Sequence, residues 1–442
     1  MVLVIGPRGA GKTALFRAVC EKNLLPVLSK RFLSLRLPPP DRTDLVIAYP
    51  AEAQFPDALG LKKFAGKVTG EAFLELWFAY MVRLLRDKLP DTARLDALFQ
   101  AVASDADAVL KAFRKAGNAP IAALDALDQE LVDDDRRVFI VYDELDTLGL
   151  SDWKAVQSAV QGLAAFWANY TRRWRRLRAK IFLRTDLYQR IGTSAGADFS
   201  KLAANRVEIS WSDRNLYAML TKRMANTSTE LLSYCREAEI EFDSDSELGE
   251  IPKIDSPEQA RPLIDRMIGP SMGANVKKGL TYRWLLDHIR DGRGQAIPRP
   301  LVRLIESASE VQRKTGTHPK WPILIEPGRL RRALETVSEE HVKDSSDEWK
   351  WLEHLGASLS KDSATREVPW DRRQVERVLE RSWDALKGQD AQASLPADSA
   401  RDFVGYLIEV GIFRERHDGR LDIPDLFLFG LGLKRKGGVA RR

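Results

Sequence analysis

The first residues of the chain, MVLVIGPRGAGKT, carry glycines, a lysine and a threonine in an order that suits phosphate binding. They fill every fixed position of the spacing G-x-x-x-x-G-K-[ST]. Glycines allow a tight turn whose backbone N–H groups point into one concavity and hold phosphate oxygens. A lysine at this place reaches the β- and γ-phosphates, and the hydroxyl that follows it ligates Mg²⁺. We therefore expect a nucleotide-phosphate site formed by Gly6, Pro7, Arg8, Gly9, Ala10, Gly11, Lys12, Thr13 and Ala14.

A second set of polar residues follows an apolar run much further along the chain. Residues 137–142 are mostly apolar, and Asp143 and Glu144 come directly after them. An acid at the end of a buried parallel strand holds water on Mg²⁺, and a second acid beside it can polarise the attacking water. We assign the metal to Thr13 and Asp143, and the catalytic water to Glu144. Asp146 is either a supporting ligand or an acid at a helix N-terminus, and we favour the helix position.

Arginines near the ends of later strands are candidates to contact the γ-phosphate. Residues 181–186 form another apolar run, and Arg184, with Thr185 beside it, is the candidate sensor. Arg184 joins Lys12 and Glu144 as the predicted catalytic set. Arg190 and Arg206 are weaker candidates for an arginine finger that acts in an oligomer. A surface ion pair is the favoured interpretation of these two.

These side chains need a sheet that brings strand ends together, and the apolar runs predict one. Short buried strands are expected over residues 2–5, 45–50, 137–142, 181–186 and 207–211. Helical spacing predicts helices over 14–20, 71–85, 92–116, 162–167 and 213–223, the last capped by Ser212 or Asp213. Alternating strands and helices indicate an α/β fold on a parallel sheet, with residues 70–130 as a helical insertion.

The composition is that of a globular protein of 442 residues with a mild net charge of +6 at pH 7. A chain of this length holds about two or three domains. It contains no apolar run of the roughly 18 residues that a membrane span needs, and no signal peptide is evident. Cys20 and Cys235 lie far apart, which argues for a reducing compartment, and the scattered histidines argue against a zinc site. We expect a cytoplasmic protein without membrane contact.

Residues 172–180, RRWRRLRAK, place six cations and no acid ahead of a predicted strand. One interpretation is a patch for nucleic acid or an acidic partner, with Trp174 stacking on a base. The other, which we favour, is a solvated helix face whose Trp174 and Leu177 face the core. The mild net charge permits a nucleic-acid partner without requiring one.

The segment from Met1 to about Arg223 resembles the ATPase core of the AAA+/STAND superfamily of P-loop ATPases. GPRGAGKT and VYDELD carry this resemblance, and FLRTD and MLTKR suggest the bacterial STAND-like subgroup. It implies a three-layer P-loop NTPase core that binds ATP with Mg²⁺ and hydrolyses it. No arginine matches a family finger position unambiguously, which leaves oligomer-dependent hydrolysis open, and the LSGGQ-like signature of ABC-type ATPases is not evident. Such proteins usually carry residues ahead of this strand, so the natural start also stays open.

The resemblance extends to the later part of the chain, where residues 291–305 resemble the lid helix of AAA+ and STAND proteins. Arg299 or Arg303 is then a candidate second sensor, with a surface arginine as an equal alternative. Helices over 371–386 and 399–410, and a hairpin over 412–424 with an Asp-Gly turn, suggest a winged helix. We predict a core over residues 1–224, a helical lid over 225–320, and a winged-helix-like domain with a basic tail over 321–442.

Two functions follow, and the sequence leaves both open. The first is an ATP-driven regulatory switch of the STAND/AAA+ type, in bacterial signalling or defence, acting on a protein partner or through self-association. The alternative is a DNA-associated ATPase that resembles origin-recognition or transposition-helper proteins. A third reading, a module that binds ATP without hydrolysing it, is disfavoured by Glu144.

Overall fold

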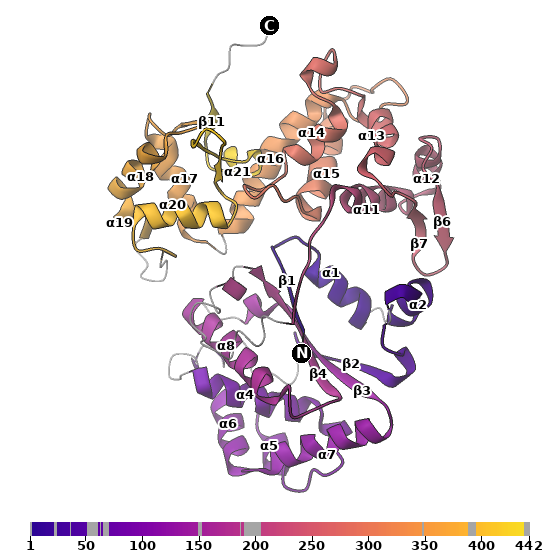
Figure 1. Cartoon of the computed structure of the whole chain (residues 1–442), viewed down its shortest axis with the longest axis vertical. Helices are drawn as coiled ribbons and strands as arrows, with labels where there is room; N and C mark the ends of the chain where they lie inside the picture. The colour runs from indigo at the N-terminus through magenta and orange to yellow at the C-terminus, as the bar shows by residue number, and fades with distance from the viewer. Residues whose placement is uncertain are drawn as a thin grey trace. The chain divides into compact units, whose positions relative to one another are not determined.

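The protein is described by a computed structural model, which covers residues 2–21, 24–35, 37–50, 61, 63–64, 70–148, 153–185, 187–189, 205–346, 349–387 and 395–436. The chain forms two compact units, Met1–Ile209 and Ser210–Arg442 (Figure 1). The sequence placed its first boundary at residue 224, whereas the helix that follows Ser212 belongs to the second unit. The further division at residue 320 stays a prediction.

The first unit is built on a five-stranded sheet in the order β2-β3-β4-β1-β5, and every pair in it is parallel. The strands are β1 (Val2–Gly6), β2 (Thr43–Tyr49), β3 (Arg137–Tyr142), β4 (Leu177–Arg184) and β5 (Arg206–Glu208). The predicted α/β fold on a parallel sheet is thus confirmed. β4 begins four residues before the predicted strand, and β5 ends before its predicted end at residue 211.

Helices cover both faces of this sheet. One face packs on α4 (Gly70–Leu84), α7 (Ala119–Asp133) and α8 (Trp153–Tyr170) in a large apolar core. The other face carries a smaller cluster, in which Phe16 of α1 (Lys12–Phe16) packs with Val4, Val141 and Phe182. The predicted helix over residues 14–20 is α-helical only to Phe16 and continues as a π-helical turn, Arg17–Glu21. The structure also describes α2, Leu25–Arg31.

The predicted insertion is helical, but its second helix is interrupted. Residues 92–116 contain α5 (Asp96–Gln100) and α6 (Ala106–Lys115) instead of one continuous helix. Asp105 accounts for the break, because its carboxylate accepts a hydrogen bond from Ala108 N at 3.0 Å and starts α6 as an N-cap.

The second unit is mainly helical. Its described helices are α11 (Asp213–Ala225), α12 (Thr229–Arg236), α13 (Arg261–Ile268), α14 (Thr281–Asp287), α15 (Pro298–Lys314), α16 (Pro327–Ser346), α17 (Trp351–Lys361), α18 (Arg372–Arg381), α19 (Trp383–Lys387), α20 (Ala400–Glu409) and α21 (Asp425–Leu428). Of the two caps proposed for α11, the structure selects Ser212, whose hydroxyl accepts from Asn215 N. The predicted helix over 371–386 is divided at Ser382 into α18 and α19.

Short strand pairs complete this unit. They are β6 (Phe242–Asp245) with β7 (Gly249–Pro252), β8 (Glu367–Val368) with β11 (Lys434–Arg435), and β9 (Arg414–Glu415) with β10 (Leu421–Asp422). The last pair confirms the predicted hairpin, and Gly419 in its turn has the left-handed φ of 76° that glycine tolerates.

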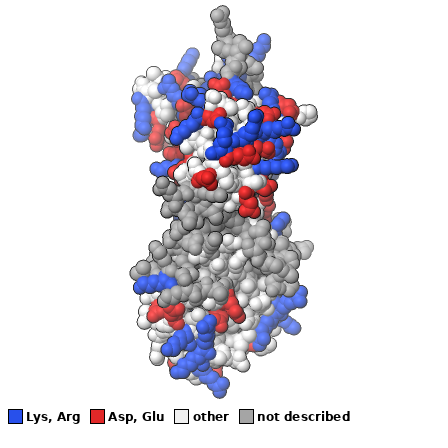
Figure 2. All heavy atoms as spheres, turned by 90° about the vertical axis from the view of Figure 1, so that its left-hand side faces the viewer, with Lys and Arg blue, Asp and Glu red and all other residues white. Residues whose placement is uncertain are grey.

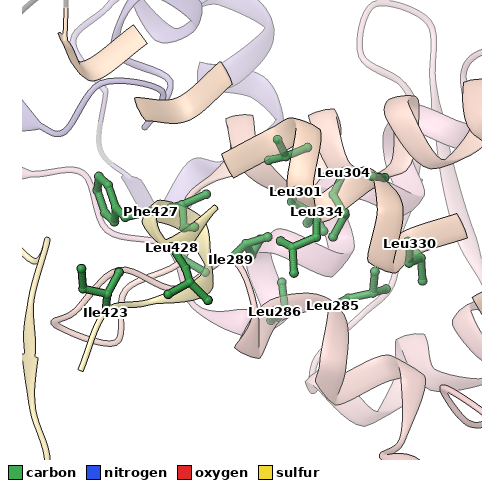
Figure 3. Close-up of a cluster of buried hydrophobic side chains, with 14 of the residues drawn as sticks. Leu285, Leu286, Ile289, Leu301, Leu304, Leu330, Leu334, Ile423, Phe427 and Leu428 are labelled. Atoms are coloured by element: carbon green, nitrogen blue, oxygen red, sulfur yellow. The ribbon is translucent and has the colours of Figure 1, made fainter. Parts of the chain in front are cut away.

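Helices distant in sequence share the core of the second unit. Figure 3 shows leucines of α14, α15 and α16 in one cluster of buried apolar side chains with Phe427 and Leu428 of α21. α21, the last helix that the structure describes, is therefore part of the core.

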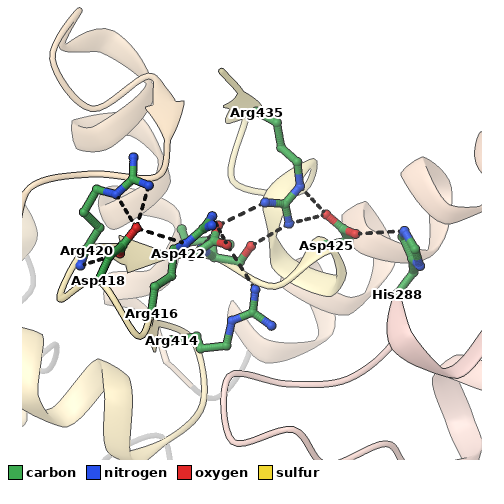
Figure 4. A network of polar contacts seen from close by, with 9 residues as sticks. His288, Arg414, Arg416, Asp418, Arg420, Asp422, Asp425 and Arg435 are labelled. Carbon is green, nitrogen blue, oxygen red and sulfur yellow. Dashed lines mark hydrogen bonds and ion pairs between the residues drawn. The ribbon is translucent and has the colours of Figure 1, made fainter. Parts of the chain in front are cut away.

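A polar network ties the hairpin to β11, the last strand among the described residues (Figure 4). Asp422 is 1% exposed and pairs with Arg414 at 3.0 Å, Arg416 at 3.6 Å and Arg435 at 3.0 Å. Arg435 also pairs with Asp425. Lys434 and Arg435, at the start of the predicted basic tail, form β11, and Arg435 is fixed by two carboxylates. Residues 437–442 lie outside the described residues.

Candidate nucleotide site

The loop between β1 and α1 has the backbone that the glycine spacing predicts. Gly9 and Gly11 have φ of 84° and 95°, in the left-handed region that side chains rarely adopt. Ala10 N donates to Pro7 O at 3.2 Å and closes the turn. A Cβ added to Gly6 would lie 3.3 Å from the Ala10 Cβ, so the loop leaves little room for a side chain at its first position.

Lys12 begins α1 and folds back over the loop. Its Nζ donates to Gly6 O at 2.8 Å and to Pro7 O at 3.1 Å. These bonds hold the ammonium against the turn that would cradle phosphate, so its charge lies beside that position. The helix also points its N-terminus at the same loop, which favours an anion there.

Asp143 follows the carboxyl end of β3, and β3 lies two strands from β1 in the sheet. Because the strands are parallel, Asp143 lies at the same end of the sheet as the loop that follows β1. It is 2% exposed, and its carboxylate accepts a hydrogen bond from the Thr13 hydroxyl. Burial raises the pKa of Asp143, while Thr13, the backbone N–H of Glu144 and the Lys12 charge lower it. Its Oδ2 is buried without a hydrogen-bond partner.

This orphaned oxygen fits a Mg²⁺ ion. A buried carboxylate oxygen without a partner is costly, and a hard cation that takes oxygen ligands would satisfy it. The Thr13 hydroxyl beside it supplies a second oxygen of the same kind. The two residues assigned to the metal from the sequence are thus brought together.

Glu144 differs from Asp143 in backbone and in exposure. Its φ of 52° and ψ of 29° are left-handed, which is uncommon outside glycine and turns the chain out of the strand. The side chain is 35% exposed, and its Oε1 lies 3.9 Å from Arg17 Nη2. Burial first, and then the neighbouring Asp143, raise the pKa of Glu144, whereas Arg17 lowers it. A solvent-accessible carboxylate with a raised pKa is suited to accept a proton from water.

Arg184 lies at the end of β4, and its Cα pairs with that of Gly6, the first residue of the loop. It is 7% exposed, and its Nη1 donates to Asp146 Oδ2 at 3.1 Å. Asp146 is in the first turn of a 3-10 helix, Leu145–Thr147, as the favoured interpretation has it. Thr185, next to Arg184, has a buried Oγ1 without a partner.

Sequence reasoning missed two ion pairs at this site. Arg17 faces Glu144, and a signal was present, because Arg17 lies four residues after Thr13, one helical turn along. The pair between Arg184 and Asp146 joins residues far apart in sequence, and nothing local indicated it.

The other arginines are not brought to this loop by their described contacts. Arg190 lies outside the described residues. Arg206 on β5 donates to the Tyr188 hydroxyl at 3.3 Å and lies over its ring. Arg299 and Arg303, on α15 of the second unit, pair with Asp344 at 3.4 Å and Glu306 at 3.8 Å. A finger or second-sensor role for them stays a prediction.

The basic run 172–180 does not form the helix that the favoured interpretation predicts. Residues 171–176 form turns, and β4 starts at Leu177. Trp174 is 1% exposed and donates to Asp125 Oδ1 at 3.0 Å, so it cannot stack on a base. The favoured interpretation was right that Trp174 and Leu177 are buried, but wrong about the helix.

No protein-family model and no curated protein matches this chain. Solved structures similar to it include the ORC2 protein of Aeropyrum pernix in ADPNP–ADP complexes, with a TM-score of 0.40 and 13% identity over 96% of this chain and 85% of that chain. The Walker-type ATPase PABY2304 of Pyrococcus abyssi has a TM-score of 0.36 and 16% identity, over 97% and 90%. Cdc6p of Pyrobaculum aerophilum has 0.29 and 12%, over 97% and 86%. These similarities are loose, and the fold assignment rests on the sheet itself.

Proposed function

We propose that the first unit binds ATP with Mg²⁺ and hydrolyses it. The observation that carries the proposal is the contact between Thr13 and Asp143, which leaves one buried carboxylate oxygen without a partner beside a phosphate-binding loop. The preference for ATP rests on the family resemblance.

Each residue of the site has a separate part in this proposal. The loop N–H groups and the Lys12 ammonium bind the phosphates, and Thr13 and Asp143 hold Mg²⁺, which neutralises charge on the β- and γ-oxygens when bound. Glu144 orients a water molecule and accepts its proton. Arg184 releases the Asp146 carboxylate and binds the γ-phosphate, since a guanidinium donates similar hydrogen bonds to phosphate and to carboxylate oxygens.

The test is turnover of ATP by the purified chain, with Lys12→Ala as the variant. Removing the ammonium should abolish turnover or nucleotide binding, because Lys12 is the phosphate-facing charge at the loop. Lys30→Ala, a lysine on α2 outside the loop, is the control and should keep the wild-type rate. Equal turnover in wild type and Lys12→Ala would rule the proposal out.

The process that uses this ATPase is proposed as a regulatory switch, with a DNA-associated ATPase as the second candidate. The hairpin gives the second candidate little support, because its arginines pair with Asp418 and Asp422. Figure 2 shows cations and acids interspersed over the face of the second unit that it draws. A group of unpaired cations on the first unit, described below, favours it. Turnover that duplex DNA stimulates at low salt and not at high salt would select the second candidate. Turnover indifferent to DNA would select the switch.

Among the described residues, no helix has the length and apolar character that crossing a membrane requires.

A further inference from the structure

A hollow of about 300 Å³ on the first unit is lined mainly by basic side chains. The basic residues that line it are Arg137, Arg175, Arg176, Arg178 and Lys180, and Phe139 forms part of its apolar floor. Among the described residues, no acid lines it. We call this feature the basic groove.

The basic groove lies toward the amino-terminal ends of β3 and β4, whereas the nucleotide site lies at the carboxyl ends of the strands. Arg137 opens β3, and Arg178 and Lys180 lie near the start of β4. Phe139 pairs with Arg178 in the parallel register, so their side chains share one face of the sheet. The phosphate-binding loop and Asp143 follow the carboxyl ends of their strands. A ligand in the basic groove would therefore be distinct from the nucleotide.

Four of the five cations make no ion pair within the described part of the chain. Arg176 pairs with Asp135 at 2.7 Å. Arg178 Nη1 donates to the backbone carbonyls of Thr171, Trp174 and Leu177, and no carboxylate pairs with it among the described residues. The Lys180 Nζ lies 4.7 Å from the centre of the Phe139 ring. The Nε of Arg137 is buried without a hydrogen-bond partner.

The nearby acids are already engaged elsewhere. Asp125 binds Arg173, and Asp135 is shared between Arg42 and Arg176. Asp128 accepts three backbone N–H groups, those of residues 175, 176 and 177, at 2.7 to 2.8 Å. Burial lowers the pKa of both Arg178 and Lys180. Partly desolvated cations without acid partners raise the free energy of the folded protein, and a bound anion would offset that cost.

We propose that the basic groove binds the phosphate backbone of a nucleic-acid strand. Four unpaired cations exceed what one phosphate needs, which favours a run of phosphates over a small anion. Arginine forks bind phosphate and carboxylate alike. An acidic polypeptide, however, carries its charges on flexible side chains whose ordering costs entropy, whereas phosphates are part of the nucleic-acid backbone itself. The proposal does not depend on ATP hydrolysis.

The test is binding of a fluorescein-labelled single-stranded oligonucleotide of mixed sequence, followed by anisotropy over a range of salt concentrations and without nucleotide. The double variant R175A/K180M removes one exposed and one partly buried cation of the groove, and methionine preserves the packing on Phe139. We expect affinity to fall about tenfold or more, and the slope of log affinity against log salt to fall by about 1.4, or ~0.7 for each phosphate contact. The matched control R94A/K111M removes the same charges at two exposed positions and should bind like the wild type.

Three outcomes would overturn the proposal. The first is no binding by the wild type, or equal affinity in wild type and R175A/K180M. The second is poly-glutamate binding as tightly as the oligonucleotide with the same loss in the variant, which would assign the groove to acidic polypeptides. The third is displacement of the oligonucleotide by inorganic phosphate at comparable concentration, which would assign it to a small anion. Arg175→Glu alone, at an exposed position, serves if the double variant does not fold, and thermal unfolding reports that.

Discussion

At the scale of single residues, the site separates two adjacent acids by environment. Asp143 is buried against Thr13, whereas Glu144 is turned out of the strand by its left-handed backbone and stays partly exposed. A buried carboxylate with an unsatisfied oxygen suits a cation, and an exposed one with a raised pKa suits water. The sequence predicted this division because an acid pair after an apolar strand has a local pattern. The left-handed turn that produces it has no local signal at a glutamate.

Glu144→Gln should bind nucleotide like the wild type but hydrolyse it about 10²–10⁴ times more slowly, the range for loss of a general base. Turnover and binding of a fluorescent nucleotide measure the two properties separately. Glu21→Gln is the matched control, because Glu21 is a nearby exposed acid that pairs with Arg17. It should keep turnover within a few-fold of wild type. A wild-type rate in Glu144→Gln would show that the base is another group.

Asp143→Asn should lose Mg²⁺-dependent turnover and yet stabilise the nucleotide-free protein at neutral pH. Because its folded pKa is raised above the unfolded value, the folded state holds more protons between the two values, and stability falls as pH rises through that window. Asparagine does not titrate, so the variant does not lose stability in this way as pH rises. Thermal unfolding should show a higher Tm for Asp143→Asn at pH 7, and a smaller difference below about pH 3, where the carboxyl is mostly protonated in both states of the wild type. A lower Tm at pH 7 would contradict this.

At the scale of elements, the strands and helices of the first unit mostly follow their apolar patterns, and one error falls where a distant side chain decides the structure. The helix predicted over residues 172–180 does not form, because the Asp128 carboxylate on α7 captures the N–H groups of residues 175–177 and leads the chain into β4. Asp128 lies 47 residues before the first of these groups. No periodicity within the run could reveal that contact.

Asp128→Ala should therefore destabilise the first unit by about 3 kcal/mol or more, since hydrogen bonds to a charged group contribute about 1.5–3 kcal/mol each and three N–H groups would lose their acceptor. Urea unfolding measures the change in the free energy of unfolding. Glu130→Ala, an exposed acid on the same helix, is the control and should change stability by less than about 0.5 kcal/mol. Similar stability in the two variants would show that other contacts hold the turn.

At the scale of the whole molecule, the chain contains two units with separate apolar cores. The candidate nucleotide site as described uses residues of the first unit alone. The second unit depends instead on its helical core and on the buried network around Asp422. The hairpin of that network could be predicted from its Asp-Gly turn. Its partner Arg435 could not, because a cation near the end of a chain looks like a solvated tail.

Separate cores should unfold in separate calorimetric transitions. Saturating nucleotide should raise the Tm of one transition only, because a ligand stabilises the unit that binds it. Asp422→Asn should lower the other by the equivalent of about 1.5–3 kcal/mol, the contribution of hydrogen bonds to a charged group, because the arginines that it leaves are partly solvated. Asp418→Asn, an exposed acid of the same hairpin, should change little and is the control. If nucleotide and Asp422→Asn shift a single common transition, the two units fold as one cooperative body, and the second unit then responds to nucleotide bound by the first.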